Sequence, residues 1–440
     1  MKRKFFLILI LILIFLFSVI KGEAEESLPD LFISTKDIAT SDITLSKALP
    51  KQGDSITIKA KVHHQGEKPV SEVVVCFFQE DKTGELIPLG EKHLVEEIKA
   101  NNFVTLTQRW SVPKNSFYKI WVVIDPDNKI KEKDESNNKD YFEVPVVAKE
   151  LHFHYWSCPK STRYVTIKML IEKEEIDYWR ERGVIPAAWK AGFCNAKWSE
   201  EQFVDSWSSA VKEGFPAIAI DEFGEGAPVD RRMDSALIKT KEKCPDLFIT
   251  LWTPGLGGTK EATEAYKKGA DLVLIEKYIS SFASYYDFDS QWEMVKKIGI
   301  ANKTLFTLGF GRWITTEQEL LRQIKYIKKL SPEMPGLSFF SSAPDYLLEF
   351  ADRFCYDYFI KPVIWVENIS SGKATITNIG GMDAEEIKIN FFSKKPEEGG
   401  GEIGSKRIES LKAGEERIIE ISSETKHLLI VPSEHYTVLD

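Results

Sequence analysis

Apolar and polar residues alternate with period two in the first third of the chain. Residues 55–62 show this pattern, and residues 73–78 and 118–124 form further strand-like runs between clusters of turn-forming residues. Such alternation is typical of strands that bury one face. Several short strands, spaced about ten residues apart over ~120 residues, predict an immunoglobulin-like β-sandwich. The predicted domain covers residues 28–148.

The pattern changes between residues 150 and 360, where short apolar runs alternate with amphipathic segments. The apolar runs, interpreted as buried strands, are residues 151–156, 184–189, 217–223, 247–253, 272–278, 304–311 and 336–342. The segments between them, interpreted as helices, are residues 173–182, 199–213, 231–243, 260–268, 291–297, 317–329 and 346–359. Repeated strand and helix units are typical of a parallel sheet.

Seven clear units in about 210 residues predict a (β/α)8 TIM-like barrel over residues 150–360. Residues 164–170 are the candidate for the missing second strand. A seven-stranded or irregular barrel is the alternative, because residues 157–163 are too few for a crossover helix.

Period-two patterns return after Pro362. Residues 375–381 and 386–392 read as two strands around a glycine turn, and residues 417–421 alternate again. They predict a second, smaller β-sandwich over residues 362–440. The predicted fold class is therefore multidomain, with a TIM-like barrel flanked by immunoglobulin-like β-sandwiches.

The first 24 residues have the pattern of a signal peptide. Lys2, Arg3 and Lys4 precede an apolar run over residues 5–17, and residues 22–24 offer a small-residue cleavage site. The run is shorter than the ~20 residues of a spanning helix. We therefore expect a secreted or cell-surface protein, with an uncleaved membrane anchor as the alternative.

Composition narrows the range of partners. The 440 residues carry a net charge of -9, and their Lys and Arg are interspersed with acids rather than gathered in a stripe, which argues against nucleic-acid binding. None of the five cysteines forms a C-x-x-C pair, so a cysteine-based zinc site is not expected. Cys158 and Cys194 could bridge neighbouring loops, although independent thiols are the default interpretation. No cofactor is predicted, and the oligomeric state is left open.

The first sandwich resembles the CARDB family, the cell-adhesion-related domain found in bacteria. The resemblance rests on residues 30–33 (Asp-Leu-Phe-Ile), on Gly53 and Asp54, and on residues 125–130 (Asp-Pro-Asp-Asn-Lys-Ile) leading to residues 132–138. It implies an extracellular setting without assigning a ligand. The acidic residues of the last motif suggest calcium, but they lack EF-hand spacing, so a turn stabilised by Asn and Asp side chains is the preferred interpretation.

Residues 217–224 (Ala-Ile-Ala-Ile-Asp-Glu-Phe-Gly) contain an apolar strand that ends in two carboxylates. Barrel strands direct branched apolar residues outward to the helices, so Ala217, Ala219 and Asp221 should face inward, with Glu222 one step further at the loop. On the other strands the same rule directs inward His152, His154, Trp156, Trp189, Thr250, Trp252, Glu276, Thr307, Gly309, Gly311 and Ser338. Apolar filling would cost less than burying these groups, so their convergence favours an active site.

Residues 220–224 resemble the strand-end acidic motif of TIM-barrel glycoside hydrolases, several families of which carry a catalytic Glu at the end of the fourth strand. The resemblance is one of fold and motif style. The chain lacks both the chitinase-like D-x-x-D-x-D-x-E run and the Asn-Glu pair of many cellulase-like enzymes, so no single family is identified.

Glycoside hydrolysis needs two carboxyl groups on opposite sides of the scissile bond. We predict Glu222 as the general acid, Glu276 as its partner, and Asp221 as a residue that orients or tunes them by like-charge repulsion. The predicted partner is a poly- or oligosaccharide. The predicted substrate-binding residues are His152, His154, Trp156, Trp189, Trp252, Tyr278 and Trp313.

Two other functions remain open. A non-catalytic surface protein that binds glycans or cells is compatible with two flanking sandwiches, because fold does not establish function. A metal-dependent hydrolase is the lesser alternative, because His152 and His154 resemble the His-x-His of amidohydrolases. That family also needs histidines on later strands, and none occurs between Trp156 and Lys426.

Overall fold

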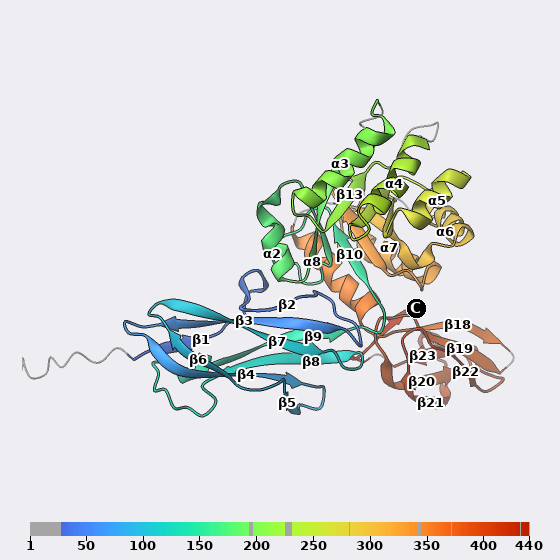
Figure 1. The fold of residues 1–440 in the computed structure, drawn as a ribbon. Coiled ribbons are helices and arrows are strands. Elements are labelled where there is room, and N and C mark those ends of the chain that lie inside the picture. Colours follow the sequence, from blue (N-terminus) through green and yellow to red (C-terminus); the bar gives the residue numbers. More distant parts are fainter. Residues whose placement is uncertain are drawn as a thin grey trace, which may run out of the picture.

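The computed structural model describes residues 28–192, 197–224, 231–280, 282–340, 345–370, 372–431 and 433–439. The predicted signal peptide and Cys194 lie outside the described residues. The chain forms an N-terminal β-sandwich, a central barrel and a C-terminal pair of sheets (Figure 1). Each part has its own cluster of buried apolar side chains.

The N-terminal sandwich consists of two antiparallel sheets. In one, β3 pairs with β1, β2 and β7; in the other, the order is β5-β4-β8-β9 and β6 also pairs with β4. Side chains of β3 alternate between buried and exposed positions, as its sequence predicts. The strands are β1 (Asp30–Phe32), β2 (Ile43–Leu45), β3 (Ser55–Gln65), β4 (Val70–Glu80), β5 (Leu86–Pro88), β6 (His93–Ile98), β7 (Asn102–Ser111), β8 (Ser116–Ile124) and β9 (Lys139–Val146).

The acidic segment before β9 is a turn held by hydrogen bonds from the backbone. Asp125 accepts from the backbone N–H of Ile130 at 2.7 Å, and Asp134 accepts from that of Ser136 at 2.9 Å. Glu132 is buried and accepts from the backbone N–H of Leu31 and, at 2.8 Å, from the Asn138 amide. These oxygens therefore cap the turn, as the preferred interpretation expects.

The central domain is a closed barrel of eight parallel strands, so the seven-stranded alternative is wrong. Its strands are β10 (His152–Tyr155), β11 (Ile167–Leu170), β12 (Ile185–Ala191), β13 (Ala217–Asp221), β14 (Phe248–Thr253), β15 (Leu272–Glu276), β16 (Thr304–Gly309) and β17 (Gly336–Phe340). Its helices are α2 (Ile176–Glu181), α3 (Glu200–Lys212), α4 (Arg231–Lys243), α5 (Lys260–Lys268), α6 (Tyr286–Ile298), α7 (Glu317–Leu330) and α8 (Asp345–Cys355), which continues as a π-helix, η7 (Tyr356–Ile360).

The first barrel unit lacks its helix, because a loop alone joins β10 to β11. The other units follow the sequence pattern closely. For example, Ser199 and Gln202 form the predicted capping box at the start of α3, which satisfies two free amides of the first turn.

The C-terminal part contains two small sheets, ordered β22-β19-β18-β24 and β21-β20-β23. The glycine turn after β19 carries the chain from one sheet to the other. Added Cβ atoms at Gly380 and Gly381 would lie 2.1 Å from the Lys361 carbonyl oxygen and 2.5 Å from that of Phe359, so only glycine fits there. The strands are β18 (Val363–Ser370), β19 (Lys373–Asn378), β20 (Ala384–Phe392), β21 (Glu402–Leu411), β22 (Glu416–Glu420), β23 (His427–Ile430) and β24 (Thr437–Leu439).

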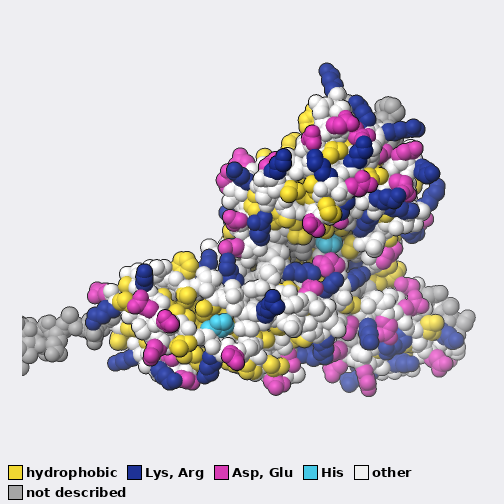
Figure 2. Space-filling model, viewed as in Figure 1, with side chains coloured by type: hydrophobic (Ala, Val, Ile, Leu, Met, Phe, Trp, Pro, Cys, Tyr) yellow, Lys and Arg dark blue, Asp and Glu magenta, His cyan; other side chains and the backbone are white. Residues whose placement is uncertain are grey.

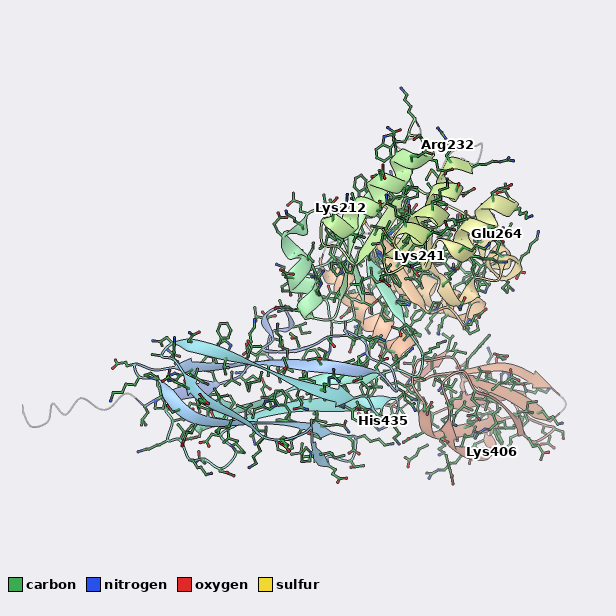
Figure 3. All side chains as sticks on the ribbon, viewed as in Figure 1. Lys212, Arg232, Lys241, Glu264, Lys406 and His435 are labelled. Carbon is green, nitrogen blue, oxygen red and sulfur yellow. The ribbon has the colours of Figure 1, made fainter. Side chains whose placement is uncertain are left out.

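The barrel stands with one end on the sandwiches (Figure 1). In Figure 3, Arg232 at the start of α4 lies far from them and Lys241 lies nearer. Helices begin where barrel strands end, so the carboxyl ends of the strands open away from the sandwiches. Arg182 and Tyr178 of the barrel donate to the Ala39 carbonyl oxygen of the N-terminal sandwich at 2.7 and 3.2 Å.

Positive and negative side chains intermingle over the face seen in Figure 2. Among the described residues, no helix is long and apolar enough to cross a membrane.

Burial raises the pKa of Glu132 to about 7, against its hydrogen bonds from Leu31 and Asn138. The folded state therefore holds a proton that the unfolded state has already lost between pH 4.5 and about 7. We predict that this contribution to the free energy of unfolding is fully present below pH 4.5 and is lost as the pH rises through 7. Urea unfolding of wild type and Glu132→Gln between pH 4.5 and 8 measures it. Parallel stability curves for the two proteins would contradict it.

Candidate active site

Strand register sorts the inward side chains of the barrel into layers. Ala219 pairs with Thr250, and Thr250 pairs with Leu272. Barrel strands are tilted, so the residue of β15 that lies at the height of Ala219 is not Leu272 but the one two positions after it. Side chains from alternate strands therefore form a common layer. By the same offset, Asp221 on β13 and Glu276 on β15 share one layer at the carboxyl ends of the strands.

Three tryptophans share the layer below. His154 pairs with Ile167, and Ile167 pairs with Ile185, so the residue of β12 at the height of His154 is two positions after Ile185. Two positions further along each strand, Trp156 is level with Trp189. The same step around the barrel makes Trp189 level with Trp252. Direct contact agrees with this assignment, because the rings of Trp156 and Trp252 meet edge to face with centroids 5.4 Å apart. The alternation predicted from sequence thus matches the register.

Asp221 and Glu276 end their strands and are both half-buried. The indole N–H of Trp189 donates to Asp221 Oδ2 at 3.2 Å. The hydroxyl of Tyr278 donates to Glu276 Oε1. One strand separates the two carboxylates, so their backbones lie about 10 Å apart. By the strand register, both side chains belong to the inner face of the barrel.

Glu222 lies in the turn that follows β13, with a φ of 54°. This left-handed conformation is unfavourable for a residue with a Cβ. The next residue, Phe223, anchors the turn through its N–H to the Trp252 carbonyl oxygen at 2.8 Å. Strained residues of this kind concentrate at functional sites, where the surrounding structure holds them.

Aromatic side chains cover the region around Glu276. Phe340 is central to them, because its ring centroid lies 5.0 Å from that of Trp156 and 5.3 Å from that of Tyr278. Tyr278 in turn packs against Trp313 at 4.6 Å. Phe340 is not among the residues predicted from sequence, although alternation from the inward-facing Ser338 indicates it. The predicted residues Trp156, Tyr278 and Trp313 therefore lie together, and Trp189 is 37% exposed beside Asp221.

The other predicted substrate-binding residues are enclosed or lie further down the barrel. Trp252 and His154 are fully buried, and His152 is at the first position of β10, toward the sandwiches. Burial lowers the pKa of His154 to about 3, and burial also lowers the pKa of His152, so both imidazoles are neutral at pH 7. Neither histidine lies in the carboxylate layer.

No group of three or more His, Cys, Asp or Glu side chains in the described part of the chain has the arrangement of a metal site. Cys158 is a free thiol among the described residues, and the bridge considered from sequence involves Cys194, which lies outside them.

The family model of CARDB matches residues 28–141, which confirms the CARDB domain at the N-terminus. A crystallised CARDB domain from Pyrococcus furiosus, described as a complex with di-metal ions, is 21% identical over 27% of this chain and 90% of that chain, with a TM-score of 0.22. A β-glucuronidase from Bacteroides uniformis is 9% identical over 90% of this chain and 59% of that chain, with a TM-score of 0.32.

A cycloisomaltooligosaccharide glucanotransferase from Paenibacillus is 10% identical over 89% of this chain and 68% of that chain, with a TM-score of 0.33. These two structures are carbohydrate-active enzymes, and their likeness to the chain is too distant to assign a reaction. A comparison with curated proteins gives no match.

Gly309 is required for the aromatic packing near Glu276. A Cβ at this position would lie 2.6 Å from Tyr278 Cδ1 and 2.8 Å from Trp313 Cε3. We predict that Gly309→Ala displaces both rings and removes the hydrogen bond from Tyr278 to Glu276, without unfolding the barrel. A crystal structure of the variant measures the displacement. Unmoved rings in a folded variant would contradict the prediction.

The conformation of Glu222 predicts an order of stability for two variants that lose the same carboxylate. Glu222→Gly relieves the left-handed strain, whereas Glu222→Ala retains it. We predict that the glycine variant is more stable than the alanine variant by about 1 kcal/mol, as measured by urea unfolding. Equal stabilities would show that the turn carries no such strain.

Proposed function

We propose that the protein is an exported glycoside hydrolase that acts on a poly- or oligosaccharide at the open end of the barrel. The single observation that carries the proposal is the group of carboxylates at the strand ends: Asp221 and Glu276 share a layer above three tryptophans, and Glu222 directly follows Asp221. Glycosidic cleavage needs two such carboxyl groups, and aromatic rings offer flat surfaces to sugar rings.

The hydrogen bonds support a division of labour. The Tyr278 hydroxyl donates to Glu276, which favours the charged form of that carboxyl group. Glu276 is therefore suited to act as the nucleophile or base. Glu222, in the strained turn, is then the general acid, and Asp221, held by Trp189, orients and tunes the pair by like-charge repulsion.

Two features support export. The basic residues Lys2, Arg3 and Lys4 before an apolar run have the pattern of a secretion signal. The CARDB domain belongs to a family that occurs in cell-surface proteins. A cleaved signal would leave an extracellular enzyme, with its barrel opening away from the domain that resembles adhesion modules.

The proposal predicts the effect of neutral isosteres. Wild type should cleave at least one member of a broad panel of polysaccharides and aryl glycosides. Glu222→Gln and Glu276→Gln should each lower kcat/KM for that substrate by at least about 100-fold, because each removes a group that acts in the transition state. Asp221→Asn should have a smaller effect, since its role is to tune. Reducing-sugar release and chromogenic assays measure these values.

Glu264→Gln is the matched control, since Glu264 lies on α5 on the barrel exterior (Figure 3) and pairs with Lys268. It should keep wild-type activity. If wild type binds members of the panel and cleaves none, the barrel is a glycan-binding scaffold and the catalytic proposal is wrong. Proton NMR of the first-formed product distinguishes retention from inversion.

A further inference from the structure

A row of polar side chains runs around the inner wall of the barrel from Glu276 into its core. Glu276 pairs with Thr307, Thr307 pairs with Ser338, and Ser338 pairs with His154. The row therefore crosses the four adjacent strands β15, β16, β17 and β10. Side chains of paired residues on neighbouring parallel strands point to the same side of the sheet, here the interior.

Three members of this row carry polar atoms without a hydrogen-bond partner among the described residues. They are Thr307 Oγ1, Ser338 Oγ and His154 Nδ1, and all three side chains are fully buried. Trp252 Nε1, two residues along β14 from the layer of His154 and in ring contact with it, also has no such partner. Buried polar groups are nearly always satisfied, so several together indicate ordered water.

The tautomer of His154 points to a donor within the row. The Thr250 hydroxyl donates its only hydrogen to the Ile218 carbonyl oxygen at 3.2 Å. At its contact of 3.3 Å with His154 Nε2 it therefore accepts, and Nε2 carries the proton. Nδ1 is then an acceptor that requires a donor, and the hydroxyl of its strand partner Ser338 or a water can supply one.

Two small side chains belong to the same layers as this row. Ala219 shares the layer of Ser338, and Ala187 shares the layer of His154, by the register that defines the other layers. Barrel interiors are normally filled by bulky branched residues. A polar site with small neighbours and three or more hydrogen-bonding atoms meets the requirements for bound water.

We propose that Thr307, Ser338 and His154 hold ordered water inside the barrel and form a hydrogen-bonded path that ends at Glu276. In this arrangement the three residues are positioning residues, and the donors at the end of the path stabilise the charged carboxylate of Glu276. The part of the inference that concerns Glu276 rests on the proposed function; the water site does not.

Other groups near Glu276 also influence its charge. They are Tyr278, which donates to it, Lys277, whose charge interacts with it, and Asp221 and Glu222 across the open end of the barrel. Thr307→Val leaves all four unchanged and removes only the hydroxyl of Thr307, the residue that pairs with Glu276 on the neighbouring strand. The variant therefore isolates the path from the direct neighbours of Glu276.

The first experiment measures stability and needs no activity. If the Thr307 hydroxyl binds water, Thr307→Val lowers the urea midpoint, since the water loses a partner; if the site is dry, valine removes an unsatisfied group and raises it. Thr304→Val is the matched control on the same strand, since the Thr304 hydroxyl donates to the Ile300 carbonyl oxygen at 2.9 Å and its loss must lower the midpoint.

A crystal structure of the full chain should contain water within hydrogen-bonding distance of Thr307 Oγ1 and Ser338 Oγ. A raised midpoint or the lack of such water would overturn the proposal.

The second experiment concerns Glu276 and uses a substrate cleaved by wild type. Thr307→Val should shift the acidic limb of the pH profile of kcat/KM to higher pH by up to about one unit. Thr307→Ser, which keeps the hydroxyl, should restore the wild-type position of the limb. An unmoved limb would overturn the path to Glu276. If wild type cleaves nothing, the proposed function fails, while the stability and crystallographic results still decide the water site.

Discussion

Closure of the parallel hydrogen-bond ladder is the constraint on which the rest of this structure depends. β10 pairs with β11 on one side and with β17 on the other, so the eight strands leave no edge. Closure with tilted strands fixes the offset between neighbours, and that offset decides which side chains share a layer. Asp221 and Glu276 are level with one another only because the ladder closes in this register.

The interior of the barrel shows a compromise between stability and polarity. Leu272, Leu274 and Leu305 fill parts of it in the usual way, whereas Thr307, Ser338 and His154 occupy one wall. Buried polar groups weaken a core unless they are satisfied. Burial keeps His154 neutral, which avoids the larger cost of an unpaired charge in the core. Under the proposed function, this polar wall serves the carboxylate at the open end of the barrel rather than the stability of the core.

The sandwiches support the barrel at the end opposite to the candidate site. Leu49 and Val147 from the N-terminal sandwich and Leu439 from the C-terminal strands belong to the same apolar cluster as the barrel interior. Close backbone contact adds to this packing, because a Cβ at Gly183 would lie 2.4 Å from the backbone of Lys47. These contacts therefore lie at the end of the barrel opposite to the carboxyl ends of the strands.

The sequence by itself determined the order of the domains and the inward or outward direction of most barrel side chains. Period-two alternation and strand and helix units are local properties, so residues such as Ser55–Gln65 and the capping box at Ser199 were predictable. The strand over Ile167–Leu170 was foreseen as a candidate, although its missing helix left the strand count open.

Only the tertiary structure decided which residues meet. Register, strand tilt and packing between distant segments decide three features of the site. They are the burial of His154 and Trp252, the central place of Phe340 among the aromatic rings, and the left-handed turn at Glu222. None of these is a property of neighbouring residues, since a side chain's height in a closed barrel is set by pairing across the ladder. For the same reason the sequence indicated the two strand-end carboxylates but not that they are level.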